Sequence, residues 1–197
     1  MRSLLRRFKS DTRGQSVIEF AVVLPLLLVV VLGVIETSYA LLDQHVVTKL
    51  TREGSNLISR DVSLGDAAAA LKSMSGRPVD FNSNSRLIFS VIRRGATSGT
   101  NNFNKDILYQ RYEIGTLAAT SLLTTRGSGS FGTGPDFQAN NADADASLQL
   151  TNLPSGILVN AGAMVYVTEI FTKHQLITPF DRFGVKVPSM LYSIAYF

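Results

Sequence analysis

Residues 20–35 read FAVVLPLLLVVVLGVI, sixteen residues without a charge. At a helical rise of about 1.5 Å per residue, this run extended back to Val17 spans about 28 Å, close to the hydrocarbon thickness of a bilayer. Pro25 and Gly33 are tolerated in a membrane helix, because neighbouring groups satisfy the freed backbone. The run therefore predicts one membrane-spanning helix.

The segment before this run carries the whole net charge of the chain. Residues 1–14 hold five basic residues and one acid, whereas the other residues hold fourteen of each sign. By the positive-inside rule we expect the basic leader in the cytoplasm and everything after about Glu36 outside. The sequence pI near 9.5 then reflects a leader and no nucleic-acid-binding face. We expect no nucleic-acid partner.

Three fates are open for the apolar segment. It could be a plain uncleaved anchor, or a secretory signal peptide cut after Ala40. Against the signal peptide, the run is longer than a usual apolar core and Glu36 adds a charge. The third fate depends on the junction at residues 13–20, RGQSVIEF, where a basic leader ends in Gly14 and Glu19 follows five residues later. A carboxylate just inside an apolar helix is costly unless it finds a partner or reaches the headgroups.

Two segments resemble a known family. Gly14, four residues and then Glu19 at the head of a membrane helix is similar to the processing signature of type IV prepilins. The longer segment RGQSVIEFAVVLP at residues 13–25 resembles the head of the TadE/TadF-like minor pseudopilins of tight-adherence (Flp, type IVc) pili. Residues 51–55, TREGS, resemble the family's AREGA segment, with Thr51 and Ser55 where alanine is common. The resemblance covers about the first sixty residues.

The resemblance implies specific roles and partners. A prepilin peptidase would cut after Gly14, Gln15 would become the new N-terminus, and Glu19 would pair with the N-terminal amine of a neighbouring subunit. The implied partners are the prepilin peptidase, other minor pseudopilins, the pilus assembly platform and the bacterial inner membrane. The implied role is pilus assembly, at initiation or at the tip, and adherence.

A large exported domain favours a minor subunit over a major one. Major pilins of these systems are far shorter and usually carry Glu-Tyr where this chain has Glu19-Phe20. The alternative function is that of a single-pass envelope protein whose exported domain binds a ligand or a surface without a pilus role. A third hypothesis is an exported enzyme released after Ala40.

The chain is predicted to have three parts and a pilin-like α+β fold. Residues 1–14 form the cytoplasmic leader, residues 15–60 a transmembrane helix with an amphipathic extension, and residues 61–197 a periplasmic α+β domain. Apolar residues of the extension recur at helical spacing, which predicts packing of one stripe on a sheet. The predicted stripe consists of Leu42, Val46, Val47, Leu50, Gly54, Leu57 and Ile58.

A short second helix and four strands are predicted in the exported domain. The helix covers residues 66–72, with Asp66 as its N-cap and with Gly76 and Pro78 after its end. Runs rich in β-branched and aromatic residues predict strands at residues 86–93, 107–114, 163–171 and 190–197. Because no long helical crossover separates these runs, a mainly antiparallel sheet is favoured, and the last strand holds the C-terminal tail.

Residues 126–146 form a long polar segment, which we expect to be a solvated surface loop. Its G-x-G-x-x-G pattern at residues 127–132 lacks the following helix that dinucleotide binding requires. Residues 140–145, NNADAD, lack the glycine and the distal glutamate of an EF-hand loop. The segment remains a candidate contact surface, because long loops often carry binding function.

No catalytic constellation is recognisable in the sequence. The chain has no cysteine, which excludes disulfides, thiol nucleophiles and cysteine-ligated metals. His45 and His174 lack a nucleophile or an acid at a recognisable spacing, so each is interpreted as a surface or packing residue. We expect no enzymatic activity, no cofactor and no metal.

Overall fold

The computed structural model describes residues 14–179 and 189–197, so the basic leader predicted at residues 1–14 lies almost entirely outside them. By its contacts the chain divides into two units. Of the described residues, the first unit comprises 14–41 with 176–179, and the second comprises 42–175 with 189–197. Helix α2, Gln15–Ile58, is continuous over 44 residues. This confirms the prediction of one long apolar helix.

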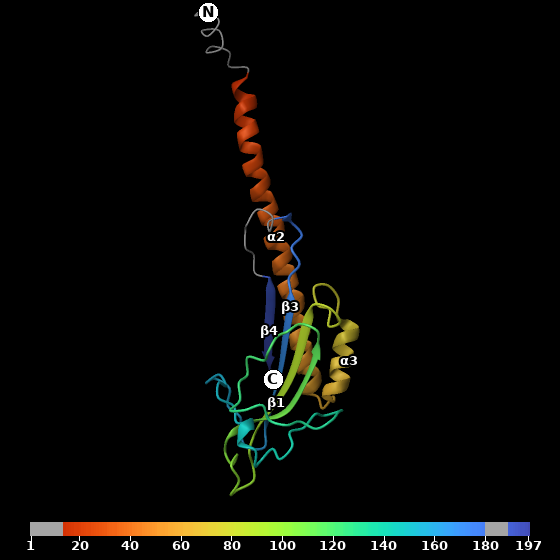
Figure 1. Ribbon diagram of the computed structural model, residues 1–197, viewed down its shortest axis with the longest axis vertical. Helices are drawn as coiled ribbons and strands as arrows, with labels where there is room; N and C mark the ends of the chain where they lie inside the picture. The colour runs from red at the N-terminus through yellow and green to blue at the C-terminus, as the bar shows by residue number, and fades with distance from the viewer. Residues whose placement is uncertain (1–13, 180–188) are drawn as a thin grey trace, which may run out of the picture. The chain divides into compact units, whose positions relative to one another are not determined.

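The second unit contains a short helix and a four-stranded antiparallel sheet (Figure 1). Helix α3 is Leu64–Met74, and the strands have the order β2-β1-β3-β4. The strand bounds are Ser85–Arg94 (β1), Asp106–Gly115 (β2), Met164–Lys173 (β3) and Met190–Tyr196 (β4), and a 3₁₀ turn, η1, covers Ala146–Leu148. All four predicted strands and their antiparallel pairing are confirmed, as is the α+β class.

The C-terminal tail is held by backbone hydrogen bonds, as predicted. The N–H of Phe197 donates to the carbonyl of Tyr166 (2.9 Å), and the N–H of Tyr166 donates to the carbonyl of Phe197 (2.8 Å). This reciprocal pair continues the β3–β4 ladder one residue beyond Tyr196. The last residue of the chain therefore belongs to the sheet edge.

The two helices cover one face of the sheet. Alternate side chains of β1, among them Leu87 and Phe89, point toward the distal half of α2 and toward α3, where they meet Val47 and Leu71. The closest approach is at Gly54, where an added Cβ would lie 2.8 Å from Cγ2 of Thr168. Figure 1 shows α3 beside the distal half of α2 on this face. Small residues on α2 therefore let helix and sheet backbones approach closely.

The buried stripe of α2 is rotated from the predicted one. Leu42 is 56% exposed, and Val46 and Leu57 are only partly buried. The buried residues of the distal half include three polar ones and are Asp43, Val47, Leu50, Thr51, Gly54, Ser55 and Ile58. The prediction placed the stripe by hydrophobicity, and it missed polar residues that find buried partners.

Those partners are specific. The hydroxyl of Thr51 donates to the carbonyl of Val47 in the preceding turn (2.7 Å), and the hydroxyl of Ser55 donates to the carbonyl of Ala195 on β4 (3.1 Å). A buried hydroxyl with a hydrogen-bond partner avoids the desolvation cost of an unpaired one. Small polar residues therefore serve on this stripe where alanine would also fit.

The N-cap of helix α3 is Ser63, not Asp66 as predicted. The Ser63 side chain accepts a hydrogen bond from the Asp66 N–H (3.1 Å), and its hydroxyl donates to Oδ2 of Asp66 (2.7 Å). Asp66 is thus the third helical residue, in an arrangement similar to a capping box. Its carboxylate also lies in the first turn, where the helix dipole favours negative charge. The helix ends at Met74, before Gly76 as predicted.

The opposite face of the sheet carries a buried carboxylate. Glu169 on β3 is fully buried and accepts hydrogen bonds from the Leu122 N–H (2.8 Å), the Ser121 hydroxyl and the Tyr192 hydroxyl (3.2 Å). The Ser121 hydroxyl also accepts from the guanidinium of Arg111 (3.0 Å). Burial lowers the pKa of Arg111, but the nearby acids Glu113 and Glu169 oppose that shift. Glu169 thus ties the segment after β2 onto the sheet.

Replacing Tyr192 with phenylalanine is expected to weaken this tie. Burial first, and then the charge of Glu169, raise the pKa of the Tyr192 phenol, so the hydroxyl stays protonated and donates. Loss of one hydrogen bond to a buried carboxylate should lower the free energy of unfolding by about 1.5 kcal/mol. Chemical denaturation of the detergent-solubilised protein measures this loss. Tyr166→Phe is the matched control, because the Tyr166 hydroxyl donates only weakly, to the sulfur of Met164 at 3.7 Å.

Candidate functional site: the N-terminal junction and the exposed helix

The predicted processing junction lies at the very start of helix α2. The Ile18 N–H donates to the carbonyl of Gly14 (3.2 Å), so the helical hydrogen-bond pattern begins at that glycine. Gly14 is exposed, and nothing lies within 4 Å of the position that a Cβ would occupy. No described residue therefore packs against Gly14. Cleavage of the peptide bond after Gly14 stays a prediction.

Glu19 has a local partner one turn away. The Nε2 amide of Gln15 donates to Oε1 of Glu19 (2.9 Å), and both side chains are exposed. An amide donor satisfies part of the carboxylate without neutralising its charge. Gln15, predicted as the new N-terminus, and Glu19, predicted to pair with a neighbouring subunit, are thus in contact. The Glu19 carboxylate can still bind a cation.

The apolar part of α2 is largely exposed. Apart from the partly buried Leu32, the large apolar side chains of residues 17–35 are between 38% and 70% exposed. The helix is long and apolar enough to cross a membrane, and the window that meets this criterion has no residue buried inside the protein. Exposed apolar surface of this extent is not stable in water and requires lipid or protein around it.

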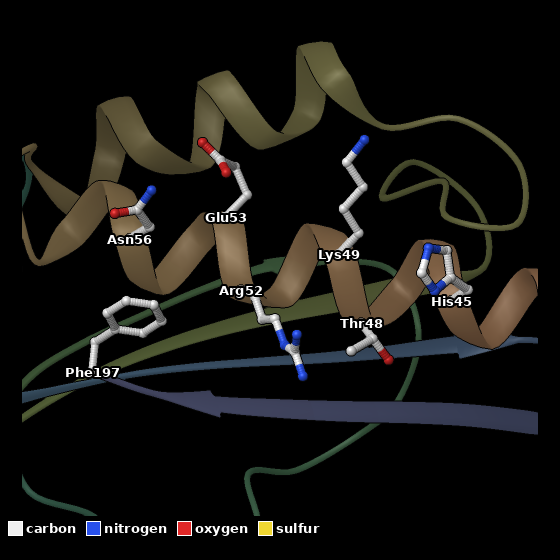
Figure 2. A pocket seen from close by; sticks show the side chains of 7 residues that line it. All are labelled: His45, Thr48, Lys49, Arg52, Glu53, Asn56 and Phe197. Atoms are coloured by element: carbon white, nitrogen blue, oxygen red, sulfur yellow. The ribbon is translucent and has the colours of Figure 1, made fainter.

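A shallow groove lies along the outward face of the distal half of α2 (Figure 2). It has a volume of about 510 Å³ and ends at the C-terminal Phe197. Figure 2 shows that its lining comes from successive turns of one helix and from the end of the chain. The lining residues are His45, Thr48, Lys49, Arg52, Glu53, Asn56 and Phe197. Their spacing, over successive turns of the helix, makes the groove an elongated strip along α2.

Two acids of α2 are buried, which the sequence analysis missed. Glu36 is 3% exposed and Asp43 6% exposed. Oδ2 of Asp43 lies 2.9 Å from Nδ1 of His174, just past the end of β3. His174 is therefore a packing residue with an acid partner, whereas His45 is exposed on α2. The seven-residue spacing of Glu36 and Asp43 places both acids on one side of a helix, and that spacing is the signal that could have found them.

The polar segment at residues 126–146 is less solvated than predicted. Oδ1 of Asp143 forms an ion pair with Arg93 (3.0 Å), and its Oδ2 accepts from the Thr97 hydroxyl (2.7 Å). The buried amide of Asn102 donates to the carbonyls of Ala142 (2.7 Å) and Asp145 (2.8 Å). The Asp143 side chain and two carbonyls of this loop therefore fasten it to β1 and to the segment after β1. Within residues 14–179 and 189–197, no group of three or more His, Cys, Asp or Glu could hold a metal ion.

Fold and site together define an α+β protein in which the described residues contain one exposed N-terminal helix that could span a membrane, consistent with a single-pass membrane protein. The family model described as TadE-like protein matches residues 14–56. This segment is therefore TadE-like, and the resemblance inferred from residues 13–25 and 51–55 is confirmed at the level of the family. No curated protein and no solved structure matches the chain.

Proposed function

We propose that the protein is a minor pseudopilin of a tight-adherence pilus, cut after Gly14 by a prepilin peptidase. The observation that carries this proposal is one arrangement within the TadE-like segment. An accessible glycine and a carboxylate five residues later stand at the head of an exposed apolar helix. That helix continues into a sheet-containing domain. The arrangement suits a subunit that is stored in a membrane and then packed against other helices.

The proposed cut would change the charge next to Glu19. Cleavage frees the amine of Gln15, whose side chain already contacts the Glu19 carboxylate. In a filament, the amine of one subunit could pair with Glu19 of its neighbour. At about 4 Å and an effective dielectric constant of about 20, two unit charges attract by on the order of 4 kcal/mol. That attraction would favour one axial register between neighbouring helices.

The exposed apolar side chains explain how one helix could serve in two environments. Residues 20–35 present no charge, so lipid tails and the apolar faces of other helices are equivalent surroundings for them. The basic leader would hold the N-terminus in the cytoplasm and the sheet domain in the periplasm. The partners would be the prepilin peptidase, other minor pseudopilins and the assembly platform in the inner membrane. The role would be assembly at initiation or at the tip, and adherence.

N-terminal sequencing of the protein purified from its native membrane tests the proposal. A chain that begins at Gln15 supports the pseudopilin. A chain that keeps residues before Gly14 would instead favour an uncleaved envelope protein whose exported domain binds a ligand or a surface. A chain that begins at Leu41 would favour an exported product released after Ala40. Each of these outcomes selects one hypothesis.

Replacing Glu19 with alanine is expected to separate processing from assembly. The cut should still occur, because Gly14 and the leader are unchanged. Co-purification with partner pseudopilins should fall about tenfold or more, since loss of a charge-assisted contact worth about 1.4 kcal/mol or more has that effect. Asp136→Ala, which removes an exposed acid from the sheet-containing unit, is the matched control. Undiminished co-purification of the Glu19→Ala protein would contradict the pairing role.

A further inference from the structure

The buried carboxylate of Glu36 holds a distant segment against helix α2. It accepts hydrogen bonds from the N–H of Ile177 (3.2 Å), the N–H of Thr178 (2.9 Å) and the hydroxyl of Thr178 (2.6 Å). These residues belong to the same unit as the membrane-span candidate. A carboxylate with several donors is stable in a water-poor setting where a bare one would not be. The contact thus fixes residues 176–178 at the level of Glu36 on the helix.

That level is close to the end of the apolar span. Glu36 directly follows the charge-free run 20–35. Seventeen helical steps separate Glu19 from Glu36, about 25 Å, whereas the hydrocarbon core of a bilayer is about 30 Å thick. A membrane that surrounds the span therefore reaches Glu36 or passes it. The hydrogen bonds from residues 177 and 178 then shield this carboxylate from lipid.

Exposed apolar side chains lie near Glu36 on both chain segments. We call this surface the juxtamembrane collar, and it consists of Tyr39 and Leu41 on α2 with Leu176 and Ile177. These side chains are 45%, 68%, 36% and 43% exposed, respectively. Between residues 20 and 41 the only charged residue is the buried Glu36. Apolar surface on the helix therefore continues past the charge-free run.

The hydroxyls on the adjacent turn are compatible with lipid as well. Thr37 donates to the carbonyl of Gly33 (2.8 Å), and Ser38 donates to the carbonyl of Val34 (2.8 Å). A hydroxyl that bonds to its own helix needs no water, which is how serine and threonine are accommodated at membrane depth. This turn of α2 therefore presents no unsatisfied hydroxyl to a membrane.

We propose that the juxtamembrane collar docks on the membrane, with Leu176 and Ile177 inserted at the boundary between headgroups and acyl chains of the leaflet at the Glu36 end of the span. Apolar and aromatic side chains favour this boundary, and we expect the Tyr39 ring to lie there as well. The chain then contacts the bilayer through the helix and through a second segment. This inference requires that α2 spans a membrane but does not depend on cleavage or on a pilus.

A single tryptophan can report the depth of the collar, because the chain has no tryptophan. Ile177→Trp is placed in the full chain and reconstituted in vesicles of phosphatidylethanolamine and phosphatidylglycerol that contain brominated phosphatidylcholine. Leu158→Trp, at a position that is 80% exposed in the other unit, is the matched control. The brominated lipid should quench the Ile177→Trp protein about threefold more than the control, because interfacial side chains are buried about 5–10 Å into the boundary.

Three further measurements test the depth of position 177 in the membrane. Bromines near the headgroups should quench the Ile177→Trp protein more than bromines near the chain ends. A nitroxide on Ile177→Cys, in a chain without cysteine, should be more accessible to oxygen than to a water-soluble nickel chelate. Quenching by aqueous iodide that is equal in the Ile177→Trp and Leu158→Trp proteins would overturn the proposal. A tryptophan at position 177 that neither iodide nor brominated lipid quenches would also overturn it, since a protein would then cover the collar.

Discussion

Replacing Gly14 with leucine is expected to leave the leader attached to the protein. The substituted chain should keep the mass of all 197 residues, whereas the unsubstituted one should lose fourteen. The effect is expected to be near complete, because a side chain at the scissile bond must fit a peptidase site that otherwise receives only a hydrogen. Intact-mass spectrometry of the protein from its native membrane measures the outcome.

The structure makes this substitution a clean test. Nothing lies within 4 Å of a Cβ at Gly14, so leucine meets no clash within the described chain. Gly76→Leu is the matched control, because Gly76 also has open space around its Cβ position. The control should be processed normally. Unchanged cleavage of the Gly14→Leu protein, or cleavage at another bond, would contradict the proposed processing.

The elements of the fold could be predicted because their signals are local. Strand β1 combines β-branched and aromatic residues over Arg86–Arg93, and the structure extends it by one residue at each end. Helix α2 was expected from an apolar run that continues into a helical repeat, and it ends at Ile58. Hydrophobic period and turn residues act within a few positions, so one sequence carries enough information to place them.

The buried face of α2 could not be predicted in full, because it depends on distant partners. Asp43 is buried because His174 lies beside it, and the two are 131 residues apart. Glu36 is buried because the N–H groups of residues 177 and 178 reach it from 141 and 142 residues away. A pattern rule counts such acids as solvent-facing. The predicted buried face of α2 therefore included Leu42, which is exposed in the structure.

The candidate site also has a part that local sequence predicts and parts that depend on distant segments. Gly14, Gln15 and Glu19 lie within one and a half turns of helix, and the contact between Gln15 and Glu19 follows from their spacing of four residues. The juxtamembrane collar joins residues near 40 to residues near 176, and the groove joins α2 to Phe197. Neither could be predicted before the chain was folded. The local part of the site concerns the proposed processing, and the non-local parts are candidate contact surfaces.

The structure also explains the small residues of the TREGS segment. Thr51, Gly54 and Ser55 are buried against the sheet, whereas Arg52 is exposed. The helical spacing of the three small residues aligns them on one face of α2. Small side chains there set the distance between helix and sheet. This part of the TadE-like segment is thus explained by packing within the chain.

Replacing Gly54 with leucine should therefore separate α2 from the sheet. A Cβ at Gly54 would lie 2.8 Å from Cγ2 of Thr168, 2.9 Å from Cδ1 of Leu71 and 3.1 Å from Cε1 of Phe89. Thr168 and Phe89 are fully buried, so neither side chain can move out into solvent to make room. Overpacking a tight core costs about 1–3 kcal/mol, occasionally more, and leucine adds three carbons beyond the Cβ. The free energy of unfolding should fall by about 3 kcal/mol or more.

Thermal unfolding of the full chain in detergent measures this effect, with a Tm lower by about 6–12 °C at about 2–4 °C per kcal/mol. The Tm of the Gly54→Ala protein should lie between those of the unsubstituted and the Gly54→Leu proteins. Alanine raises helix propensity by about 1 kcal/mol, which opposes the cost of the clash. Arg52→Leu is the control, since it adds the same side chain on the exposed face of the same helix and should change stability by less than about 0.5 kcal/mol. If Gly54→Leu unfolds at the temperature of that control, the close approach at Gly54 does not hold α2 to the sheet.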